Sequence, residues 1–570
     1  MFEIRQFDVD EAKPVITDDE LRRRWAQFHG NIHMVSGNRL RRTIGRMLGE
    51  DTRRYHVARF FGRPLLKVIR ALRGTTKPEP TTKLVVEAPD EVFFPINYRP
   101  HLLDQPYRSD EGIAATDVTI VRGDESAASP DEFIVTLNDV AARATTTWLM
   151  IADSADPTGD AILAREVLRT AARDDDDVVF ADEFGPTPHA PTLKSPAVGP
   201  HTLLSYNVVG RPALIRMESI RRVGGFSPEA GWAYEHDLFL RLSEIDATFH
   251  HVAELLLGGR RTSSFERSHL DADTLRVVKA ALDRRGWSGS VEPGAFAGLV
   301  KWRVDVPTPP PSIDIVIPTR DRVDLMRQCI DAITAKTTYP NYNIIILDND
   351  SVDPETLAYF RDCPYQVVPC PGPFNYAHIV NRGVAHATAD YVLTLNNDTI
   401  VVTPDWLERL VSLAALPGVG FVGACLLDQD GRREHESIVI SPYPQHLRTD
   451  SNYWHADSFV NATRNVAAVT GAVQMVERAW WNELGGMDEQ LKVVMNDVDI
   501  CLRSHVAGRY VVYTPDVQLY HHVSSSRGSL DPLDDRNRFI RRWDIFGTFA
   551  DPYFPESLLL LGETMYYRFR

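Results

Sequence analysis

The stretch SIDIVIPTRDRVDLMRQCIDAITAKTTYPNYNIIILDND, residues 312–350, decides the fold class of this 570-residue chain. Its apolar run Ile313–Pro318 is typical of a buried strand, and apolar residues recur at helical spacing over Val323–Ala335. A second apolar run, Ile344–Asp348, reads as the next strand. Strands alternating with helices predict a parallel-type sheet covered on both faces. We therefore expect an α/β fold.

Two proline-rich breaks divide the chain. TTKPEPTTK at 75–83 follows a basic segment, and VDVPTPPPS at 304–312 precedes the strand described above. Proline-rich stretches of this kind act as stiff spacers. We predict four parts: an N-terminal arm at 1–85, one domain at 86–290, a second domain at 291–550 and a C-terminal tail at 551–570.

The chain also repeats itself. Asn207–Glu244 and Asn465–His505 each contain a small-residue strand, a helix, a Gly-Gly pair and then acid-x-Asp-x-x-x-Arg. The shared residues are Gly224, Gly225, Glu235, Asp237 and Arg241 in the first stretch, and Gly485, Gly486, Asp497, Asp499 and Arg503 in the second. We infer two copies of one domain.

Charge is distributed unevenly. Between Leu21 and Lys77 the arm holds fifteen Lys and Arg and two acids, so it carries about +13 in a chain of net charge −16. Apolar and basic residues recur at helical spacing over His56–Arg73, which predicts a basic amphipathic helix. That helix could pack on the acidic body of the protein or contact an anionic membrane. A nucleic-acid enzyme would carry positive charge over its working surface, so no nucleic-acid partner is expected.

The composition favours a cytoplasmic protein, with peripheral contact at the inner face of the cell membrane if the arm binds lipid. No run approaches about 18 apolar residues, and the N-terminus lacks the order of a secretory signal. The five cysteines have no metal-ligand spacing, which favours a reducing compartment.

Polar residues follow three predicted strands of the second domain. Thr319 and Arg320 follow the first, Asp348 ends the second, and Asn396-Asn397-Asp398 follows a later strand, Tyr391–Leu395. Ligands of open α/β sheets bind beyond the carboxyl ends of the strands, so these residues predict a polar cleft. The sequence contains neither a P-loop nor a GxGxxG motif after a strand.

Residues 312–528 resemble an inverting family 2 glycosyltransferase of the GT-A fold, and in particular the tandem-domain enzymes of O-antigen, rhamnan or related polysaccharide assembly. The matching segments are SIDIVIPTRDRVDLMRQCID, YPNYNIIILDNDSVDPET, GPFNYAHIVNRGVAHA, YVLTLNNDTIVVTPDWLE, VAAVTGAVQMV, LGGMDEQ, NDVDICLR and YHHVSSSRG. The resemblance implies two GT-A-like domains in tandem, the first degenerate, preceded by a basic helical arm.

The resemblance also implies a donor site for a nucleotide sugar. Asp398 takes the place of the family's DXD-type metal ligand, and His521 that of its metal-binding histidine, with His522 left as an alternative. A Mn²⁺ or Mg²⁺ ion there would neutralise charge on the leaving diphosphate. The implied donor contacts are Thr319, Arg320, Asp348, Asn381, Asn396, Asn397, Ser526 and Arg527.

On the acceptor side, the resemblance makes Asp497 the catalytic base. A sugar hydroxyl is too weakly acidic to ionise at neutral pH, so a carboxylate must take its proton as the new bond forms. Asp499 and Arg503 are an i,i+4 pair expected mainly to hold Asp497 in place. His435 matches a position near the acceptor, although Glu434 stands where the family usually has Gln.

The first copy reads as eroded. Ala155 falls on the position of the metal-binding aspartate, and Gly258-Gly259-Arg260 stands where the histidine should be. Glu235 occupies the base position, while the opening strand is not recognisable between residues 86 and 130. We predict a non-catalytic domain that is structural or orients the acceptor; a shifted metal pair, Asp153 and Asp156, is the alternative.

These features predict a metal-dependent inverting glycosyltransferase. It would move a hexose or deoxyhexose from a nucleoside-diphosphate sugar to a hydroxyl of a growing, lipid-linked polysaccharide. The alternatives are a bifunctional two-site polymerase and a non-catalytic scaffold for other transferases. A sugar-nucleotide pyrophosphorylase would need a glycine-rich loop after the first strand, and PTRDR at 318–322 lacks the glycines.

Overall fold

The computed structural model describes residues 92–95, 117–123, 129–153, 158–184, 191–256, 264–295, 297–441, 443–448, 460–522, 532–545, 549–556, 558–561 and 564–569. All of these elements belong to one compact unit. The predicted arm at 1–85 lies outside the described residues, and so do Ser526 and Arg527. Among the described helices, none has the length and apolar character needed to cross a bilayer.

The larger sheet has ten strands, in the order β12-β11-β10-β13-β20-β15-β21-β14, with β16 paired to β15 and β19 to β21. Strands β12, β11, β10 and β13 are parallel, whereas β20 is antiparallel to both of its neighbours. The strands are β10 (Ile313–Thr319), β11 (Tyr342–Asp348), β12 (Gln366–Pro369), β13 (Tyr391–Leu395), β14 (Thr399–Val401), β15 (Val419–Leu427), β16 (Arg433–His435), β19 (Arg464–Asn465), β20 (Val473–Glu477) and β21 (Tyr510–His521).

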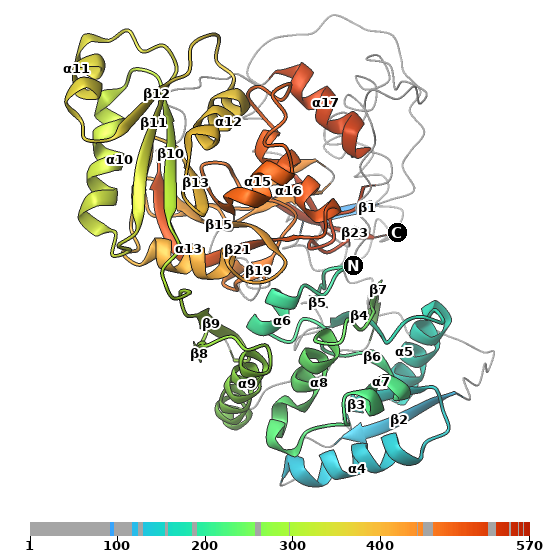
Figure 1. Cartoon of the computed structure of the whole chain (residues 1–570). Helices are drawn as coiled ribbons and strands as arrows, with labels where there is room; N and C mark the ends of the chain where they lie inside the picture. The colour runs from blue at the N-terminus through green and yellow to red at the C-terminus, as the bar shows by residue number, and fades with distance from the viewer. Residues whose placement is uncertain are drawn as a thin grey trace, which may run out of the picture. The chain divides into compact units, whose positions relative to one another are not determined.

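Helices cover this sheet and bury its central strands. Helices α10 and α12 flank the parallel strands (Figure 1), and β10 is buried at every residue from Ile313 to Ile317. The helix predicted at 323–335 is α10, with Met326, Ile330 and Ile333 buried as expected. The α/β prediction is confirmed. The helices of this part are α10 (Val323–Lys336), α11 (Pro354–Asp362), α12 (Tyr376–His386), α13 (Trp406–Ala414), α15 (Arg478–Glu483), α16 (Asn496–Val506) and α17 (Leu533–Trp543).

The smaller sheet has six strands, in the order β2-β3-β6-β4-β5, with β7 paired to β4. Its strands are β2 (Val118–Gly123), β3 (Trp148–Asp153), β4 (Val178–Phe184), β5 (Pro191–Thr192), β6 (Ala213–Arg216) and β7 (Phe249–Leu256). The accompanying helices are α4 (Pro130–Arg143), α5 (Thr158–Ala171), α6 (Pro200–Ser205), α7 (Met217–Arg222), η2 (Pro228–Ala233), α8 (Tyr234–Ser243) and α9 (Ser264–Arg284).

The two sheets share an order and a set of directions. The path β2-β3-β6-β4-β7 matches β10-β13-β20-β15-β21: the outer pairs are parallel, and β6 and β20 are each antiparallel to both neighbours. Strand β2 takes the place of β10, so an opening strand exists at 118–123 although its sequence gave no recognisable signal. Among the described residues of the smaller sheet, β11 and β12 have no counterpart. The matching order supports the predicted duplication.

Smaller sheets fall at the predicted domain ends. Strands β8 (Gly289–Pro293) and β9 (Val300–Val304) form a hairpin, so the predicted boundary at 290/291 lies inside a paired element. The predicted tail contains β22 (Leu558–Leu561) and β23 (Thr564–Phe569), which pair with each other, and β23 also pairs with β1 (Val92–Pro95). In the sequence, β17 (Ile438–Ile440) and β18 (Pro444–His446) come between β16 and β19, and these two strands form a separate two-stranded sheet.

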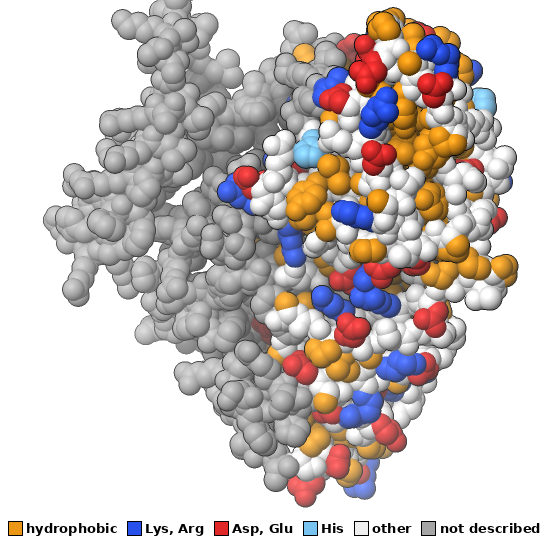
Figure 2. Space-filling view, turned by 90° about the vertical axis from the view of Figure 1, so that its left-hand side faces the viewer, with side chains coloured by type: hydrophobic (Ala, Val, Ile, Leu, Met, Phe, Trp, Pro, Cys, Tyr) orange, Lys and Arg blue, Asp and Glu red, His pale blue; other side chains and the backbone are white. Residues whose placement is uncertain are grey.

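The surface drawn in Figure 2 intersperses basic, acidic and hydrophobic side chains over its described part. This mixture is typical of a solvated face. It contrasts with the concentrated positive charge of residues 21–77, which lie outside the described residues.

Candidate functional site

Three loops at the carboxyl ends of β10, β11 and β12 are joined by side-chain hydrogen bonds to backbone groups. The Asp321 carboxylate accepts from the N–H groups of Val352 and Asp353, at 2.7 and 2.8 Å. The Asn349 amide donates to the carbonyls of Cys370 and Gly372, at 2.8 and 3.1 Å. These bonds are made within the protein itself, so the edge of the sheet is pre-organised for a ligand.

The same edge holds backbone in an uncommon conformation. Asp321, Arg322 and Asp350 have φ values of 52°, 54° and 56°. Residues other than glycine are strained in this left-handed region, and such strain tends to gather at functional sites.

The structure brings three predicted donor residues together at this edge. Thr319 lies opposite Asp348 in the parallel register of β10 and β11, and the Asn397 amide donates to the Thr319 hydroxyl at 2.9 Å. One oxygen of Asp348 accepts from the Ser351 N–H at 3.0 Å. Arg320 is exposed beside them. Asn396 is buried, and its backbone N–H donates to the Ala472 carbonyl at 3.0 Å.

His521, the last residue of β21, lies between two carboxylates. The pairing of β14 with β21 places His521 next to the turn that carries Asp398. His521 Nε2 is 3.4 Å from Asp398 Oδ1, and His521 Nδ1 is 3.4 Å from Glu434 Oε2. All three side chains are mostly buried. The contact of Glu434 with His521 was not predicted, and its only signal in the sequence is an acid where the family usually has Gln.

The electrostatics of this group suit a cation. Burial lowers the pKa of His521, but the two carboxylates outweigh burial and raise the pKa to about 9. Asp398 Oδ1 and Glu434 Oε2 are buried without a hydrogen bond of good geometry. A hard divalent cation would satisfy the Asp398 oxygen and would displace a proton from His521, whose freed nitrogen could then bind the ion.

The protein side of such a site is incomplete by itself. Within the described residues, no group of three or more His, Cys, Asp and Glu side chains is arranged to hold a metal ion. Oxygen atoms of a substrate would therefore have to complete the coordination. His522 contributes its backbone N–H to the Asp398 carbonyl at 2.9 Å, so the geometry favours the ring of His521 as the ligand.

Asp497 is held at the first turn of α16. One of its oxygens accepts from the Gly471 N–H and the other from the Val498 N–H, both at 2.9 Å. The N-terminus of a helix stabilises a carboxylate through its free N–H groups and its dipole. Gly471 is tightly enclosed, since an added Cβ would lie 3.1 Å from the Tyr376 hydroxyl. Asp497 is half-buried and keeps access to solvent.

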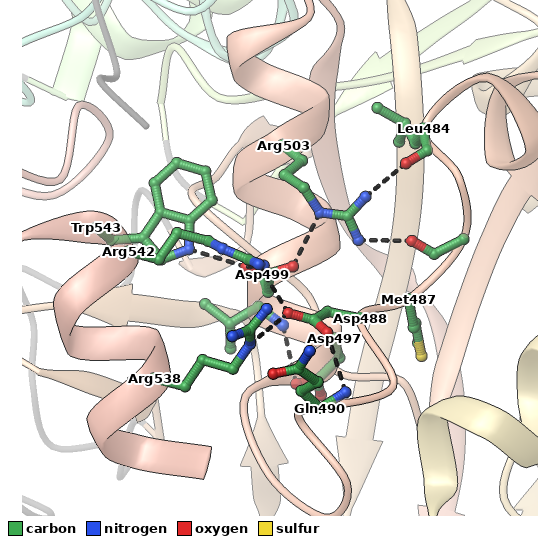
Figure 3. Close-up of polar contacts among 12 residues, drawn as sticks. Leu484, Met487, Asp488, Gln490, Asp497, Asp499, Arg503, Arg538, Arg542 and Trp543 are labelled. Atoms are coloured by element: carbon green, nitrogen blue, oxygen red, sulfur yellow. Dashed lines mark hydrogen bonds and ion pairs between the residues drawn. The ribbon is translucent and has the colours of Figure 1, made fainter. Parts of the chain in front are cut away.

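Asp499, two residues further on, is fully buried and supports the helix (Figure 3). It accepts from Arg503 Nε at 2.8 Å, Arg542 Nη1 at 2.7 Å and Trp543 Nε1 at 3.1 Å. Arg503 also donates to the carbonyls of Leu484 and Gly486, at 2.7 and 2.6 Å. Asp499 and Arg503 therefore face the interior of the protein, in keeping with the supporting role expected for them.

Helix α17 is tied to the loop that leads into Asp497. Asp488 accepts from Arg538 and Arg542, both at 2.7 Å. Asp535 accepts from the N–H groups of Val493 and Val494, at 2.7 and 3.1 Å. The position of α16 thus depends on contacts from α17, about 40 residues downstream.

Asn381 braces the same loop. Its amide exchanges two hydrogen bonds with the backbone of Met487, both at 2.8 Å. In the first copy Asn138 makes the same two bonds with Phe226, again at 2.8 Å. Arg241 there donates to the carbonyls of Val223 and Gly225 as Arg503 does in the second copy. The geometry therefore favours bracing over donor contact for Asn381.

The acid at the base position of the first copy is neutralised. Arg211 Nε lies 3.0 Å from both oxygens of Glu235, and both side chains are buried. The Glu235 carboxylate is thus engaged by a cation inside the protein. Ala155, Asp156 and Gly258–Arg260 lie outside the described residues, as do the side-chain surroundings of Asp153.

We expect the Glu235→Gln variant to keep the transfer rate of the wild type within about twofold. Because Gln loses the charge that compensates buried Arg211, stability should fall by about 2 kcal/mol. Urea unfolding and initial rates of transfer measure the two effects. A second transfer activity that disappears in this variant would instead show that the first copy is an active transferase.

Part of the second copy matches a known protein family. Residues 314–484 match the sequence profile of Glycosyl transferase family 2. The chain contains a family 2 glycosyl transferase domain. The match includes Thr319, Asp348 and Asp398, whereas Asp497 and His521 lie beyond it.

The chain is also similar in sequence to known proteins. The O-antigen biosynthesis protein RfbC of Myxococcus xanthus is 32% identical over 422 residues, which cover 70% of this chain and 32% of RfbC. The N-acetylglucosaminyl-diphospho-decaprenol L-rhamnosyltransferase of Mycobacterium tuberculosis is 26% identical over 212 residues, 33% of this chain and 68% of that protein. The chain thus spans about a third of the length of RfbC.

Among solved structures, the mannosyltransferase PcManGT of Pyrobaculum calidifontis, in complex with GDP-Man and Mn²⁺, is 18% identical. The match covers 46% of this chain and 68% of that chain, with a TM-score of 0.31.

Proposed function

We propose that the family 2 domain is a metal-dependent inverting glycosyltransferase. The observation that supports the proposal most directly concerns two consecutive residues, Gly471 and Ala472. The Ala472 carbonyl accepts a hydrogen bond from the Asn396 N–H, and the Gly471 N–H donates one to Asp497. The loop of the proposed metal ligand Asp398 and the proposed base are thus held by one stretch of backbone. A leaving group on one side and an acceptor on the other is the arrangement that a single displacement requires.

The proposed chemistry is one in-line displacement. Asp497 takes the proton from an acceptor hydroxyl while that oxygen attacks the anomeric carbon of the donor. The bond from the anomeric carbon to the diphosphate oxygen breaks with inversion, and the nucleoside diphosphate leaves. A divalent cation, Mn²⁺ or Mg²⁺, held by Asp398 and His521 would supply positive charge to the departing diphosphate. Thr319, Asp348 and Asn397 are proposed to contact the nucleoside.

The substrate classes follow from the relatives. We propose a nucleoside diphosphate hexose or deoxyhexose as donor, since the Mycobacterium tuberculosis relative is named for L-rhamnose transfer. The decaprenol in that name supports a lipid-linked glycan acceptor. Such an acceptor would bring the protein to the inner face of the cell membrane, where the basic arm could contact anionic lipid.

A donor screen tests the proposal. Purified full-length protein is incubated with Mn²⁺ and each of several nucleotide sugars, and release of nucleoside diphosphate is measured with and without EDTA. We expect release from one donor class and its loss on chelation. Equal rates in EDTA would remove the metal from the proposal, and no release from any donor in the presence of glycan acceptors would overturn the transferase itself.

A further inference from the structure

Two histidines lie side by side near the proposed acceptor side. His435 ends β16 and is 1% exposed, while His446 ends β18 and is exposed to solvent. Their Nδ1 atoms are 2.9 Å apart, and their rings meet edge to face with centroids 4.9 Å apart. A buried ring therefore holds a surface ring in one orientation.

The hydrogen bonds of His435 assign the tautomer of both rings. The Thr470 N–H donates to His435 Nε2 at 3.4 Å, so that nitrogen carries a lone pair. Burial, with smaller effects from nearby cationic groups, lowers the pKa of His435 well below its usual value, which keeps the ring neutral. A neutral imidazole has one N–H, which must then be at Nδ1 and donate to His446 Nδ1. The remaining proton of a neutral His446 is therefore on Nε2.

The same backbone segment connects this pair to the proposed base. Thr470, which holds His435, is followed directly by Gly471, whose N–H donates to Asp497 at 2.9 Å. Protein atoms around the ring lower the pKa of His446, and the charge of Asp497 opposes that shift. His446 is thus within electrostatic reach of Asp497, and the residue is exposed to solvent.

We propose that His446 recognises the acceptor glycan: its Nε2–H donates a hydrogen bond to a sugar hydroxyl oxygen beside the hydroxyl that Asp497 deprotonates. This inference rests on the proposed function. In this tautomer both nitrogens of His446 are committed, one as acceptor from His435 and one as donor, so the ring selects oxygen acceptors and is not a second base. His435 is a positioning residue, and fixing the ring in advance reduces the entropy lost on binding.

The tautomer can be measured without any substrate. In full-length protein with ¹⁵N-labelled histidine, we expect the His446 imidazole to show protonated Nε2 and unprotonated Nδ1 near pH 8. His386 is an internal control of the opposite type, because its Nδ1 lies 2.8 Å from the Arg382 carbonyl and must donate. A His435→Asn substitution should leave His386 unchanged and shift His446 toward a mixture of tautomers. A His446 ring protonated at Nδ1 in the wild type would overturn the proposed tautomer and, with it, the role of His435 in positioning the ring.

Kinetics test the recognition role. The probe acceptors are a panel of alkyl glycosides, and transfer of the donor sugar to water serves as the reference reaction. We expect His446→Leu to raise the acceptor KM about three- to tenfold, the effect of one lost hydrogen bond. Transfer to water should stay within about twofold, and His446→Gln, which restores an N–H donor, should recover most of the loss. His386→Leu is the matched surface control and should change neither reaction.

The outcomes separate this inference from the proposed function. If wild-type protein releases no nucleoside diphosphate with any donor, the transferase proposal fails. If transfer proceeds but His446→Leu leaves the acceptor KM unchanged, only the recognition role fails. Equal loss of transfer to glycoside and to water would mean that His446 acts on the donor reaction instead.

Discussion

The Asp497→Asn variant should transfer sugar about 10²- to 10⁴-fold more slowly than the wild type, the usual range for loss of a general base. Asn can still accept a hydrogen bond from the Gly471 N–H, so the first turn of α16 should keep its geometry. Because the substitution is nearly isosteric, donor affinity should change by less than about twofold. Single-turnover transfer and isothermal titration with the donor nucleotide measure the two quantities.

A matched control for this variant exists in the other copy. Glu235 stands at the corresponding position of the repeat but is paired with Arg211, so Glu235→Gln should leave transfer intact. If Asp497→Asn weakens donor binding as much as it slows transfer, Asp497 belongs to the donor site. If transfer is unaffected, another group takes the proton.

The regular elements of the second copy were predictable because their signals are local. Apolar runs predicted β10, β11 and β13, and helical spacing predicted α10 to within one residue at its C-terminal end. Strand β2 was missed because Thr119 and Arg122 interrupt the apolar run of Val118–Gly123, and because the Pro-Thr-Arg-Asp sequence at the end of β10 has no match there. In the predicted tail, β23 was missed for a different reason. Its partner β1 lies more than 450 residues away in the sequence, and such pairing leaves no local pattern.

In the candidate site too, features with a local sequence signal were predicted, and contacts that depend on the tertiary fold were not. The positions of Asp398, His521 and Asp497 at strand and helix ends followed from motif order. In the structure His521 lies 3.4 Å from Asp398, and Asp497 accepts a hydrogen bond from the Gly471 N–H. Two contacts were not predicted: that of Glu434 with His521 and that of His446 with His435. Each joins residues that are apart in the sequence and are brought together only by the tertiary fold. For Asn381, its place in a family segment predicted donor contact, whereas the bonds that its amide makes to the backbone of Met487 depend on the tertiary fold; the donor contact stays a prediction.

Replacing Asp499 by Asn should lower stability by about 3–5 kcal/mol, because it removes the one carboxylate between two guanidinium groups in a dry site. Arg503 and Arg542 both donate to Asp499, which has no exposed surface, and their own side chains are only 14% and 10% exposed. The measurement is the urea midpoint of the unfolding phase reported by Trp543, whose indole N–H donates to Asp499.

The matched control is Asp405→Asn. Asp405 and Arg409 form an i,i+4 pair at 2.8 Å, the same spacing and distance as Asp499 and Arg503, but the Asp405 side chain is 40% exposed. Exposed pairs contribute at most about 1 kcal/mol, so this variant should unfold close to the wild type. Equal effects in the two variants would show that burial does not set the contribution of Asp499. Because α16 carries Asp497 at its first turn, we also expect Asp499→Asn to slow transfer at temperatures where the protein is still folded, and a normal rate there would mean that the base keeps its position without this network.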